Sequence, residues 1–276
     1  MSETTIQDLS GVAETLLLPL YNRAMETQRP DAMLKDEKAV ELVTQMRLDF
    51  SRVRQVRMTE LSKAIRIIFT REFDRYTRDF LRRHPDAVVV HIGCGLDTRF
   101  ERVDDGRVEW YDLDVPEVID LRRKLIGGEA GRYHLLDGSV LEDAWLDAMK
   151  MHAPRPILFL AEAVFVYFTE AQVKRLVLTL RDRFPGAELV FDGWKPFEIW
   201  VGNRYLSNSP FAGLMRWGFW SGRQIEGWGA GIHMLGQWGF FDQPEPRLGI
   251  FRLMRFIPFI ARAVRIVHYC LRMAAG

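Results

Sequence analysis

The chain has 276 residues, of which 48% are hydrophobic and 27% charged, and its 38 Lys and Arg nearly balance its 37 Asp and Glu. A formal charge of +1 with this much apolar content excludes an intrinsically disordered chain and argues against a nucleic-acid partner. A chain of this length buries most of the surface that it exposes when unfolded, so its core needs no disulfide. The composition indicates a soluble, globular chain of the size of an enzyme.

The balanced total conceals two basic segments. Residues 45–83 contain eleven Lys and Arg against five Asp and Glu, and residues 247–276 contain six Arg and no acid, so each carries +6 and the remainder carries −11. Basic segments can mark nucleic-acid or membrane surfaces, but solvated helix faces are the commoner cause. The longest apolar stretches, 157–168 and 256–267, are shorter than the roughly 20 residues that span a membrane. We expect neither a membrane span nor a nucleic-acid partner.

The only cysteines are Cys94 and Cys270. Two thiols so far apart, in a chain whose first eleven residues lack a signal-peptide pattern, favour a reducing compartment, and we expect a cytoplasmic protein. Their spacing builds no metal site.

Residues 12–83 are expected to be helical throughout, because apolar residues between Ile65 and Leu81 recur every three or four positions. His84 and Pro85 end this region. Its apolar stripe is suited to packing on a larger unit, as a helical cap.

Short β-branched runs and helical patterns then alternate. Strands are expected at Ala87–Ile92, Val108–Leu113, Arg132–Leu136, Ile157–Ala161 and Ala187–Asp192, and helices at Glu117–Ile126, Leu141–Met151 and, from a capping box at Thr169, to Phe184. This alternation predicts an α/β fold with a doubly wound, mainly parallel, Rossmann-like sheet.

The interval from Trp194 to Phe241 has no clear period. It holds six of the eight Trp and six Phe and Tyr, a quarter of its 48 residues against 12% in the whole chain. Such faces suit a flat aromatic or lipid-like ligand under a lid, although core packing of an irregular insertion explains them equally well. A short helix is expected within it, with a cap at Ser221 and inward side chains at Ile225, Trp228 and Ile232.

A closing helix at 249–260 and a last strand at Arg265–Leu271 are expected next. The whole chain is then one domain, divided into a helical cap (1–84), a core of alternating strands and helices (85–193), an aromatic lid region (194–248) and a closing helix and strand (249–276).

The glycine pair in Gly93-Cys94-Gly95 follows the first predicted strand. Glycine lets the backbone turn sharply there and approach a ligand closely. Thr98 stands where the dinucleotide fingerprint has its third glycine, so the pattern alone is also compatible with a plain turn.

Two acids at the end of the second strand add to this signal. Asp112 and Asp114 follow the glycines by about 20 residues and share one strand face. One of them can bind the ribose hydroxyls of an adenosine cofactor while the other caps the helix that begins at Pro116, or both can be caps. S-adenosylmethionine and NAD both fit this arrangement.

Several ordered motifs carry a family resemblance. The chain resembles the leucine carboxyl methyltransferase family, specifically its bacterial, tetracenomycin-type polyketide O-methyltransferase branch, in the segments 88–100 (with Gly-Leu-Asp-Thr-Arg), 110–118, 159–168, 18–26 and 71–80. The resemblance implies a class I S-adenosylmethionine-dependent methyltransferase with an N-terminal helical cap.

The resemblance also implies site residues. It assigns Arg71 to the methionine carboxylate of the cofactor, which suits the planar guanidinium, and Asp114 to the ribose. The other residues that it places at the cofactor are Gly93, Cys94, Gly95, Ser139 and Val140, the last two beside adenine, and Glu162.

Glu162 stands out in an otherwise apolar strand. A buried carboxylate is costly unless it is paired, so we expect either the cationic cofactor or a structural arginine beside it. Two departures from the family affect the shape of the site: Ala163 stands where this branch often carries glycine, and His91 where other methyltransferases often have an acid.

Transfer of an already activated methyl group needs positioning and water exclusion more than a catalytic group, and we commit to no catalytic residue among the candidates Tyr167, His91 and His233. The predicted function is O-methylation of a hydroxyl or carboxyl of a small aromatic, polyketide-like metabolite. The alternatives are a protein C-terminal carboxyl methyltransferase, a nicotinamide-dependent oxidoreductase and a non-catalytic binding protein. The oligomeric state is left open.

Overall fold

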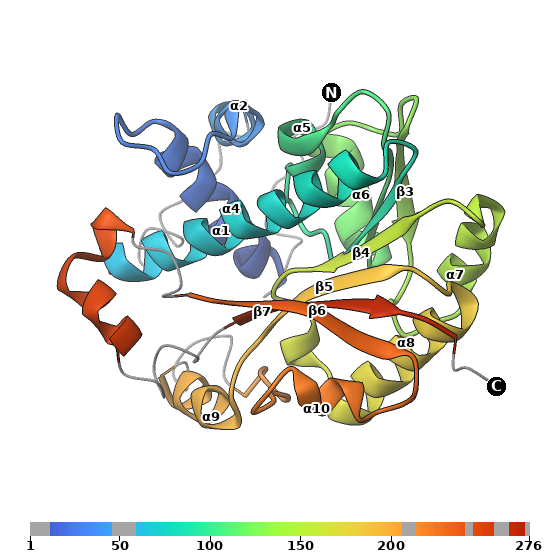
Figure 1. Cartoon of the computed structure of the whole chain (residues 1–276). Coiled ribbons are helices and arrows are strands. Elements are labelled where there is room, and N and C mark those ends of the chain that lie inside the picture. Colours follow the sequence, from blue (N-terminus) through green and yellow to red (C-terminus); the bar gives the residue numbers. More distant parts are fainter. Residues whose placement is uncertain (1–11, 46–58, 206–212, 241–244, 257–264, 274–276) are drawn as a thin grey trace.

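The computed structural model describes residues 12–45, 59–205, 213–240, 245–256 and 265–273 (Figure 1). The strands are β1 (Val88–Ile92), β2 (Glu109–Asp114), β3 (Tyr133–Asp137), β4 (Ile157–Ala161), β5 (Glu188–Gly193), β6 (Ile232–Gly239) and β7 (Arg265–Leu271). The α-helices are α1 (Val12–Thr27), α2 (Glu37–Gln45), α4 (Glu60–Arg83), α5 (Arg99–Val103), α6 (Pro116–Leu125), α7 (Ala144–Met149), α8 (Glu170–Arg183), α9 (Pro196–Tyr205) and α10 (Arg223–Glu226). The 3₁₀ helices are η2 (Lys150–His152), η3 (Phe165–Tyr167) and η4 (Pro246–Phe256).

The strands form one sheet in the order β3-β2-β1-β4-β5-β7-β6. The first five are parallel, while β7 runs antiparallel to β5 and β6 antiparallel to β7. The doubly wound, mainly parallel α/β sheet is therefore confirmed. The first five strands were visible in the sequence because a parallel strand covered on both faces is a nearly continuous apolar run.

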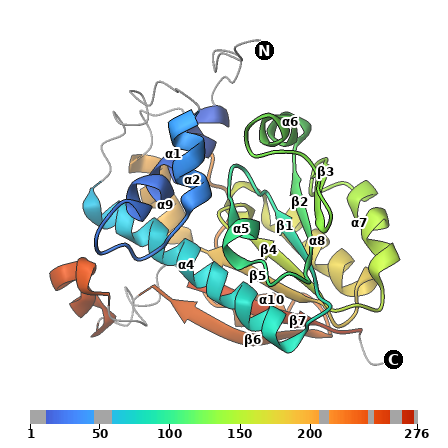
Figure 2. The same cartoon turned by 90° about the horizontal axis from the view of Figure 1, so that it is seen from above.

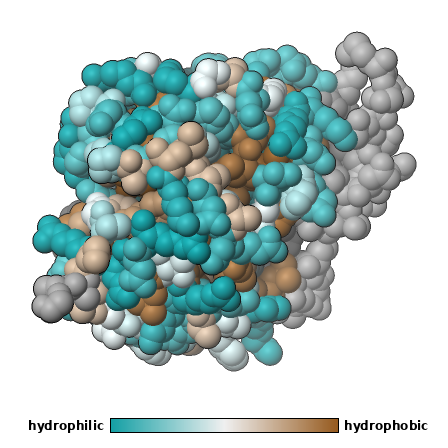
Figure 3. Space-filling model, turned by 90° about the vertical axis from the view of Figure 1, so that its right-hand side faces the viewer, coloured by the Kyte–Doolittle hydropathy of each residue, from teal (hydrophilic) through white to brown (hydrophobic). Residues whose placement is uncertain are grey.

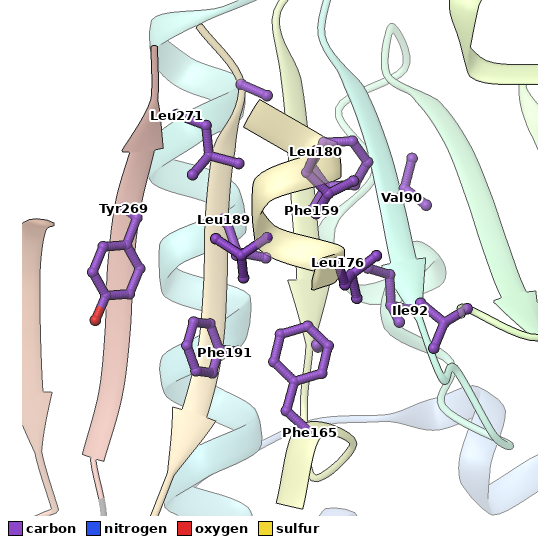
Figure 4. Packing of buried hydrophobic residues seen from close by; sticks show 14 of the residues in the cluster. Val90, Ile92, Phe159, Phe165, Leu176, Leu180, Leu189, Phe191, Tyr269 and Leu271 are labelled. Atoms are coloured by element: carbon purple, nitrogen blue, oxygen red, sulfur yellow. The ribbon is translucent and has the colours of Figure 1, made fainter. Parts of the chain in front are cut away.

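Helices cover the sheet on both faces (Figures 1 and 2). Helix α4 crosses one face, where its Phe73 and Phe80 join the core that also holds Val89 of β1. Helices α7 and α8 lie on the other face, where Val88 belongs to the second core. Figure 4 shows Leu176 of α8 in that second core. Alternate residues of β1 thus face opposite cores, which fixes the register of β1.

The N-terminal region differs from the continuous helical stretch expected for 12–83. Helices α1 and α2 are separated by residues 28–36, and α4 begins only at Glu60, while residues 46–58 lie outside the described part. Asp36 ends the first break, its backbone oxygen bonded to the N–H of Val40 at 3.3 Å. The periodicity predicted helices correctly but did not show the break, because an N-capping acid resembles any other polar helix residue.

The aromatic interval also differs from expectation. It contains β6, an edge strand paired with β7, so Ile232 begins a strand and does not face inward from a helix. Two helices lie there among the described residues: α9 (Pro196–Tyr205), which was not predicted, and α10. In α10, Ile225 is buried, and just before it Ser221 Oγ accepts from the N–H of Arg223 at 3.3 Å. An edge strand with one solvent-facing side carries too few apolar residues to stand out from a loop.

The closing segment is partly as expected. Strand β7 occupies the predicted residues 265–271. In place of a helix beginning at Gly249, the 3₁₀ helix η4 is interrupted there, because Gly249 has φ +53°. Residues 257–260 of the predicted helix lie outside the described part.

No helix among the described residues is long and apolar enough to cross a bilayer. Figure 3 views the molecule from the side on which α7 lies and shows a mainly hydrophilic surface, with apolar residues visible between the polar ones. The buried cores described above account for much of the apolar content of the sequence.

Candidate functional site

The carboxyl ends of the parallel strands bring the predicted site residues to one edge of the sheet. Strand β1 lies between β2 and β4, and the chain leaves it toward β2 on one side while β4 begins the other half. This is the topological switch point, where ligands of open α/β sheets bind. Residues that follow β1, β2, β3 and β4 therefore lie along one edge of the sheet.

The turn after β1 requires glycine at two positions. Gly93 and Gly95 have φ of +64° and +52°, in the left-handed region that side chains disfavour. A Cβ on Gly93 would also lie 2.5 Å from Cγ2 of Val164. The N–H groups of Gly93 and Cys94 both donate to the carbonyl of Leu113, at 2.7 and 3.2 Å, so the turn is fastened to β2. Cys94 itself is buried.

Asp114 joins this turn to the next strand. Its Oδ2 accepts from the N–H of Gly95 at 2.8 Å, and its Oδ1 accepts from the N–H of Val115, also at 2.8 Å. Burial raises the pKa of the Asp114 carboxyl, against these two bonds. The side chain is partly exposed, and each oxygen keeps a lone pair for a further donor. A hydroxyl pair of a ligand can bind there.

Asp112 occupies a different environment. Its carboxylate is 1% exposed, and its oxygens accept from Trp110 Nε1 at 2.8 Å, from the Tyr133 hydroxyl at 2.6 Å and from Arg122. The structure therefore corrects its inclusion among the cofactor contacts: Asp112 pairs with a buried guanidinium beneath the edge. The alternation of side chains along a strand predicted that Asp112 and Asp114 share one face. It did not predict which of the two carboxylates is accessible.

The loop after β3 continues the same edge. Gly138 donates its N–H to the carbonyl of Asp114 at 2.9 Å, which places the following Ser139 next to the ribose candidate. The Ser139 hydroxyl oxygen accepts from the N–H of Leu141 at 3.3 Å. Val140 is buried in the core under α8, with its carbonyl bonded to Trp145 Nε1 at 3.2 Å. Ser139 is the more accessible of the two predicted adenine neighbours.

Glu162, directly after β4, has the structural partner that the sequence analysis kept open. Its Oε1 accepts from the Thr70 hydroxyl of α4 at 2.9 Å, and its Oε2 pairs with Arg99. The carboxylate keeps 21% exposure. Glu162 is thus oriented by the protein from one side and open from the other, as a contact for a cationic ligand group requires.

The Gly-Leu-Asp-Thr-Arg segment mainly forms the ion pairs that hold Glu162 and the glycine turn in place. Arg99 is fully buried, with Nε donating to Asp74 Oδ1 of α4 at 2.8 Å and Nη2 lying 3.1 Å from Asp97 Oδ2. Arg102 reaches Asp74 at 2.8 Å and Asp97 at 2.9 Å. Burial opposes ionisation of Asp97, but Arg102 and Arg99 hold its pKa well below the usual range. These charges fasten α4 to the turn that carries the glycines.

The network extends to the cap through Asp36, which sequence reasoning missed. The Thr98 hydroxyl lies 2.7 and 2.6 Å from its two oxygens, and Arg23 of α1 donates to it at 2.9 Å. Arg23 also donates to the Leu96 carbonyl at 2.7 Å. No short sequence signal links Asp36 to Thr98 across 62 residues, so only the fold reveals that the cap is attached to the cofactor turn.

Two arginines of α4, Arg66 and Arg71, are candidates for binding an anionic group of the ligand. Arg71, the residue that the resemblance favours, is paired with Glu245 Oε2 at 3.1 Å and is one-third exposed. Arg66 lies one turn before Thr70 on the same helical face and is exposed, and the charge of the Glu162 carboxylate acts on its guanidinium. Within the described ranges it has no hydrogen bond or ion pair, so it is available to a ligand. Among eleven cations of one basic segment, the sequence had no means of selecting it.

The comparisons with known proteins agree with this geometry. Residues 17–181, more than half of the chain, match the family profile described as leucine carboxyl methyltransferase. The chain belongs to the leucine carboxyl methyltransferase family. It is 34% identical to the tetracenomycin polyketide synthesis O-methyltransferase TcmP of Streptomyces glaucescens, over 95% of this chain and 97% of that protein.

A second relative of this family member is the S-adenosyl-L-methionine-dependent methyltransferase dpfgK of Gibberella zeae, 31% identical over 75% of this chain and 74% of that protein. Among solved structures, a DUF574 family protein from Streptomyces avermitilis superposes with a TM-score of 0.57 at 13% identity, covering 93% of this chain and 96% of that one. A Thermobifida fusca protein gives 0.55 at 15% identity, with coverages of 91% and 94%. The structures support the shared fold, and the relatives show an S-adenosylmethionine-dependent O-methyltransferase.

The three catalytic candidates are dispersed in this methyltransferase. His91 is buried between Arg99 and Asp112, and His233 is exposed on the edge strand β6. Tyr167 of η3 follows the loop after β4 and is 42% exposed. Among the described residues, no group of three His, Cys, Asp or Glu could hold a metal ion.

Proposed function

We propose that this enzyme methylates a hydroxyl or carboxyl oxygen of a small, aromatic, polyketide-like metabolite in the cytoplasm. The observation that carries the proposal is the meeting of the cofactor edge with the aromatic segment. The N–H groups of Arg216 and Trp217 donate to the carbonyl of Val166 in η3, at 2.7 and 3.3 Å. Aromatic side chains thus lie next to the loop after β4. The printed name of TcmP supports the substrate class.

The cofactor would be held along the strand ends. The turn at Gly93 and Gly95 would face the cofactor, Asp114 would accept from the ribose hydroxyls, and Ser139 and Val140 would border the adenine. Glu162 would face the positive amino or sulfonium end. The observation that supports this fit is the glycine turn at the switch point, where both glycines have positive φ.

For the carboxylate of the cofactor we favour Arg66 over Arg71. Arg66 and Glu162 present opposite charges on the same side of α4, so together they match the zwitterionic methionine end. Arg71 already has Glu245 as its partner. Each assignment can be tested by one substitution, at Arg66 or at Arg71.

S-adenosylmethionine supplies an activated methyl group, so the chain has to position the acceptor oxygen and exclude water. We assign the acceptor to the described residues of the aromatic segment, 194–205 and 213–231, which is less than the predicted lid of 194–248 because β6 belongs to the sheet. Phe197 and Trp200 of α9 stack with ring centroids 6.1 Å apart and are 49% and 61% exposed. A flat aromatic acceptor could cover such rings favourably.

Calorimetry with S-adenosylhomocysteine tests the cofactor site. We expect binding by the folded wild type, at least tenfold weaker binding by Arg66→Ala, and a change below threefold for Arg71→Ala. The reverse order would restore Arg71 as the carboxylate contact. Absence of binding by folded wild-type protein would contradict the cofactor site itself.

Incubation of a cell extract with methyl-labelled cofactor, followed by mass spectrometry, tests the acceptor. We expect label in an aromatic metabolite. Label at a polypeptide C-terminus would favour the protein carboxyl methyltransferase alternative, which the family description keeps relevant.

A further inference from the structure

Asp192, near the end of β5, connects two segments that both border the site. Its Oδ1 accepts from the backbone N–H of Ala163 at 2.6 Å, and its Oδ2 accepts from Trp194 Nε1 at 3.2 Å. The residue is only 7% exposed. One buried carboxylate therefore contacts the turn after β4 and the first indole of the aromatic segment.

The turn after β4 needs this support. Ala163 has φ +57°, a conformation that costs a residue with a Cβ on the order of 1 kcal/mol. It lies between Glu162 and Val164, whose Cγ2 fills the space where Gly93 lacks a Cβ. The bond from Ala163 to Asp192 opposes the strain and so keeps Glu162 and the glycine turn in place.

The other carboxylate oxygen of Asp192, Oδ2, bonds to Trp194, the first residue of the aromatic segment. The carbonyl of Trp194 accepts from the N–H of Phe219 at 2.8 Å, and a Cβ on Gly193 would lie 2.0 Å from the Phe219 ring. The chain after β5 is therefore closely packed against a second stretch of the same segment. Because α9 begins two residues after Trp194, a fixed Trp194 ring also orients the start of that helix.

We propose that Asp192 is a positioning residue for methyl transfer, which holds the Glu162 turn and Trp194 in a fixed relation and thereby sets the acceptor against the cofactor. This inference rests on the proposed function, since it takes the aromatic segment as the acceptor wall. A displacement of about 1 Å between reacting groups can lower a rate by about a hundredfold. Because the Asp192 carboxylate bonds to both the turn after β4 and Trp194, it opposes such a displacement between them.

Asp192→Asn separates the two contacts. The amide oxygen still accepts from Ala163, but the amide nitrogen then meets the Trp194 N–H, donor against donor. Trp194→Phe removes the same contact from the other side, and the double variant closes a cycle. We expect each single variant to lower the rate of label transfer to the small molecules of the cell extract at least tenfold, and the double variant to be no slower than the slower single variant.

Two further measurements make the result specific. S-adenosylhomocysteine should bind Asp192→Asn within threefold of wild type, whereas acrylamide quenching of the Trp194 emission, obtained as wild type minus Trp194→Phe, should increase in Asp192→Asn. Unchanged quenching and rate in Asp192→Asn, or additive losses in the double variant, would overturn the proposal. Absent S-adenosylhomocysteine binding in the wild type would instead contradict the proposed function.

Ala163→Gly tests the other contact. Asp192→Ala loses both bonds and should bind S-adenosylhomocysteine at least fivefold more weakly. Glycine at position 163 removes the strain, so Asp192→Ala with Ala163→Gly should recover most of that affinity while label transfer stays low. Recovery of both, or of neither, would contradict the separation of the two contacts.

Discussion

The two halves of the carboxyl edge are held in different ways. At the ends of β1 to β4, buried arginines bond the carboxylates on several sides, so that Asp74 and Arg99 have no exposed side-chain surface. The described parts of the aromatic segment, 194–205 and 213–231, are attached through backbone bonds and a few side chains, and Trp200 and Trp220 keep 61% and 58% exposure. The ionic half suits a cofactor of fixed shape, and the lightly attached half suits a broad apolar acceptor.

The largest expected effect is on the ionic half. Arg99→Ala leaves the carboxylates of Asp74, Asp97 and Glu162 short of a buried partner, and we expect a loss of about 3–5 kcal/mol in the free energy of unfolding. Urea denaturation measures it. Arg132→Ala, which removes a partly exposed ion pair with Asp104, is the control and should cost below about 1 kcal/mol. Equal losses would show that the network stabilises no more than a surface pair.

Gly93→Ala should disable the cofactor turn with less damage to the fold. Both the positive φ and the contact with Val164 oppose a Cβ there, and we expect at least a hundredfold weaker binding of S-adenosylhomocysteine, about 3 kcal/mol. Gly128→Ala is a matched control, since nothing lies within 4 Å of its Cβ position. Calorimetry compares the two, and similar affinities would contradict the role of the turn.

The two ends of β5 should respond to pH with opposite signs. Glu188 at its start accepts from Arg83 and His268, each at 2.7 Å, and these partners, against burial, lower its pKa to about 2. Burial, with repulsion from Glu162, raises the pKa of Asp192 to about 6. Stability from Glu188 is complete above its unfolded pKa of about 4.5 and is lost as the pH falls toward 2; ionisation of Asp192 costs stability as the pH rises through 6.

The matched amides test these signs. Glu188→Gln should lower the free energy of unfolding by about 3 kcal/mol at pH 7, and the deficit should shrink toward pH 2. Asp192→Asn should raise it at pH 8 by about 2 kcal/mol, because the cost of the buried charge exceeds one lost hydrogen bond, and should match wild type near pH 4. Urea denaturation across pH measures both, and a destabilised Asp192→Asn at pH 8 would contradict the assigned sign.

The smallest expected effect is on the lightly attached half. Asn203 of α9 donates to the Met215 carbonyl at 2.8 Å and accepts from the Met215 N–H at 3.3 Å. Asn203→Ala should change global stability by about 1 kcal/mol or less and leave S-adenosylhomocysteine affinity unchanged, while amide exchange over 213–219 becomes faster. Faster exchange at the glycine turn as well would show that the two halves are not independent.

Much of the cofactor half could be predicted from the sequence. Gly93 and Gly95 lie in a strand-to-helix turn that only glycine fits comfortably, and Asp114 follows a strand whose apolar run identifies it. The place where the family often has glycine, Ala163, also proved informative, since its φ of +57° explains that preference. These signals are local, because they depend on one strand and the turn after it.

The remaining features depend on contacts between distant segments. Asp112 and Asp114 look equivalent in the sequence, and only Arg122 and Tyr133 decide that the first is buried. Arg66 and Arg71 belong to one basic helix, and only the rotation of α4 against the strand ends distinguishes them. Strand β6 was missed because its pairing with β7 supplies what its own apolar pattern lacks.

The sequence by itself determined the first five strands, the glycine turn and the family. Burial of a parallel strand and the φ of a glycine are properties of a few neighbouring residues. The tertiary structure alone decided which charges meet: Asp36 with Thr98, Arg99 with Glu162, and Asp192 with both Ala163 and Trp194. Charged side chains have no period that identifies their partners, since a pair forms wherever the fold brings the two groups within hydrogen-bond distance.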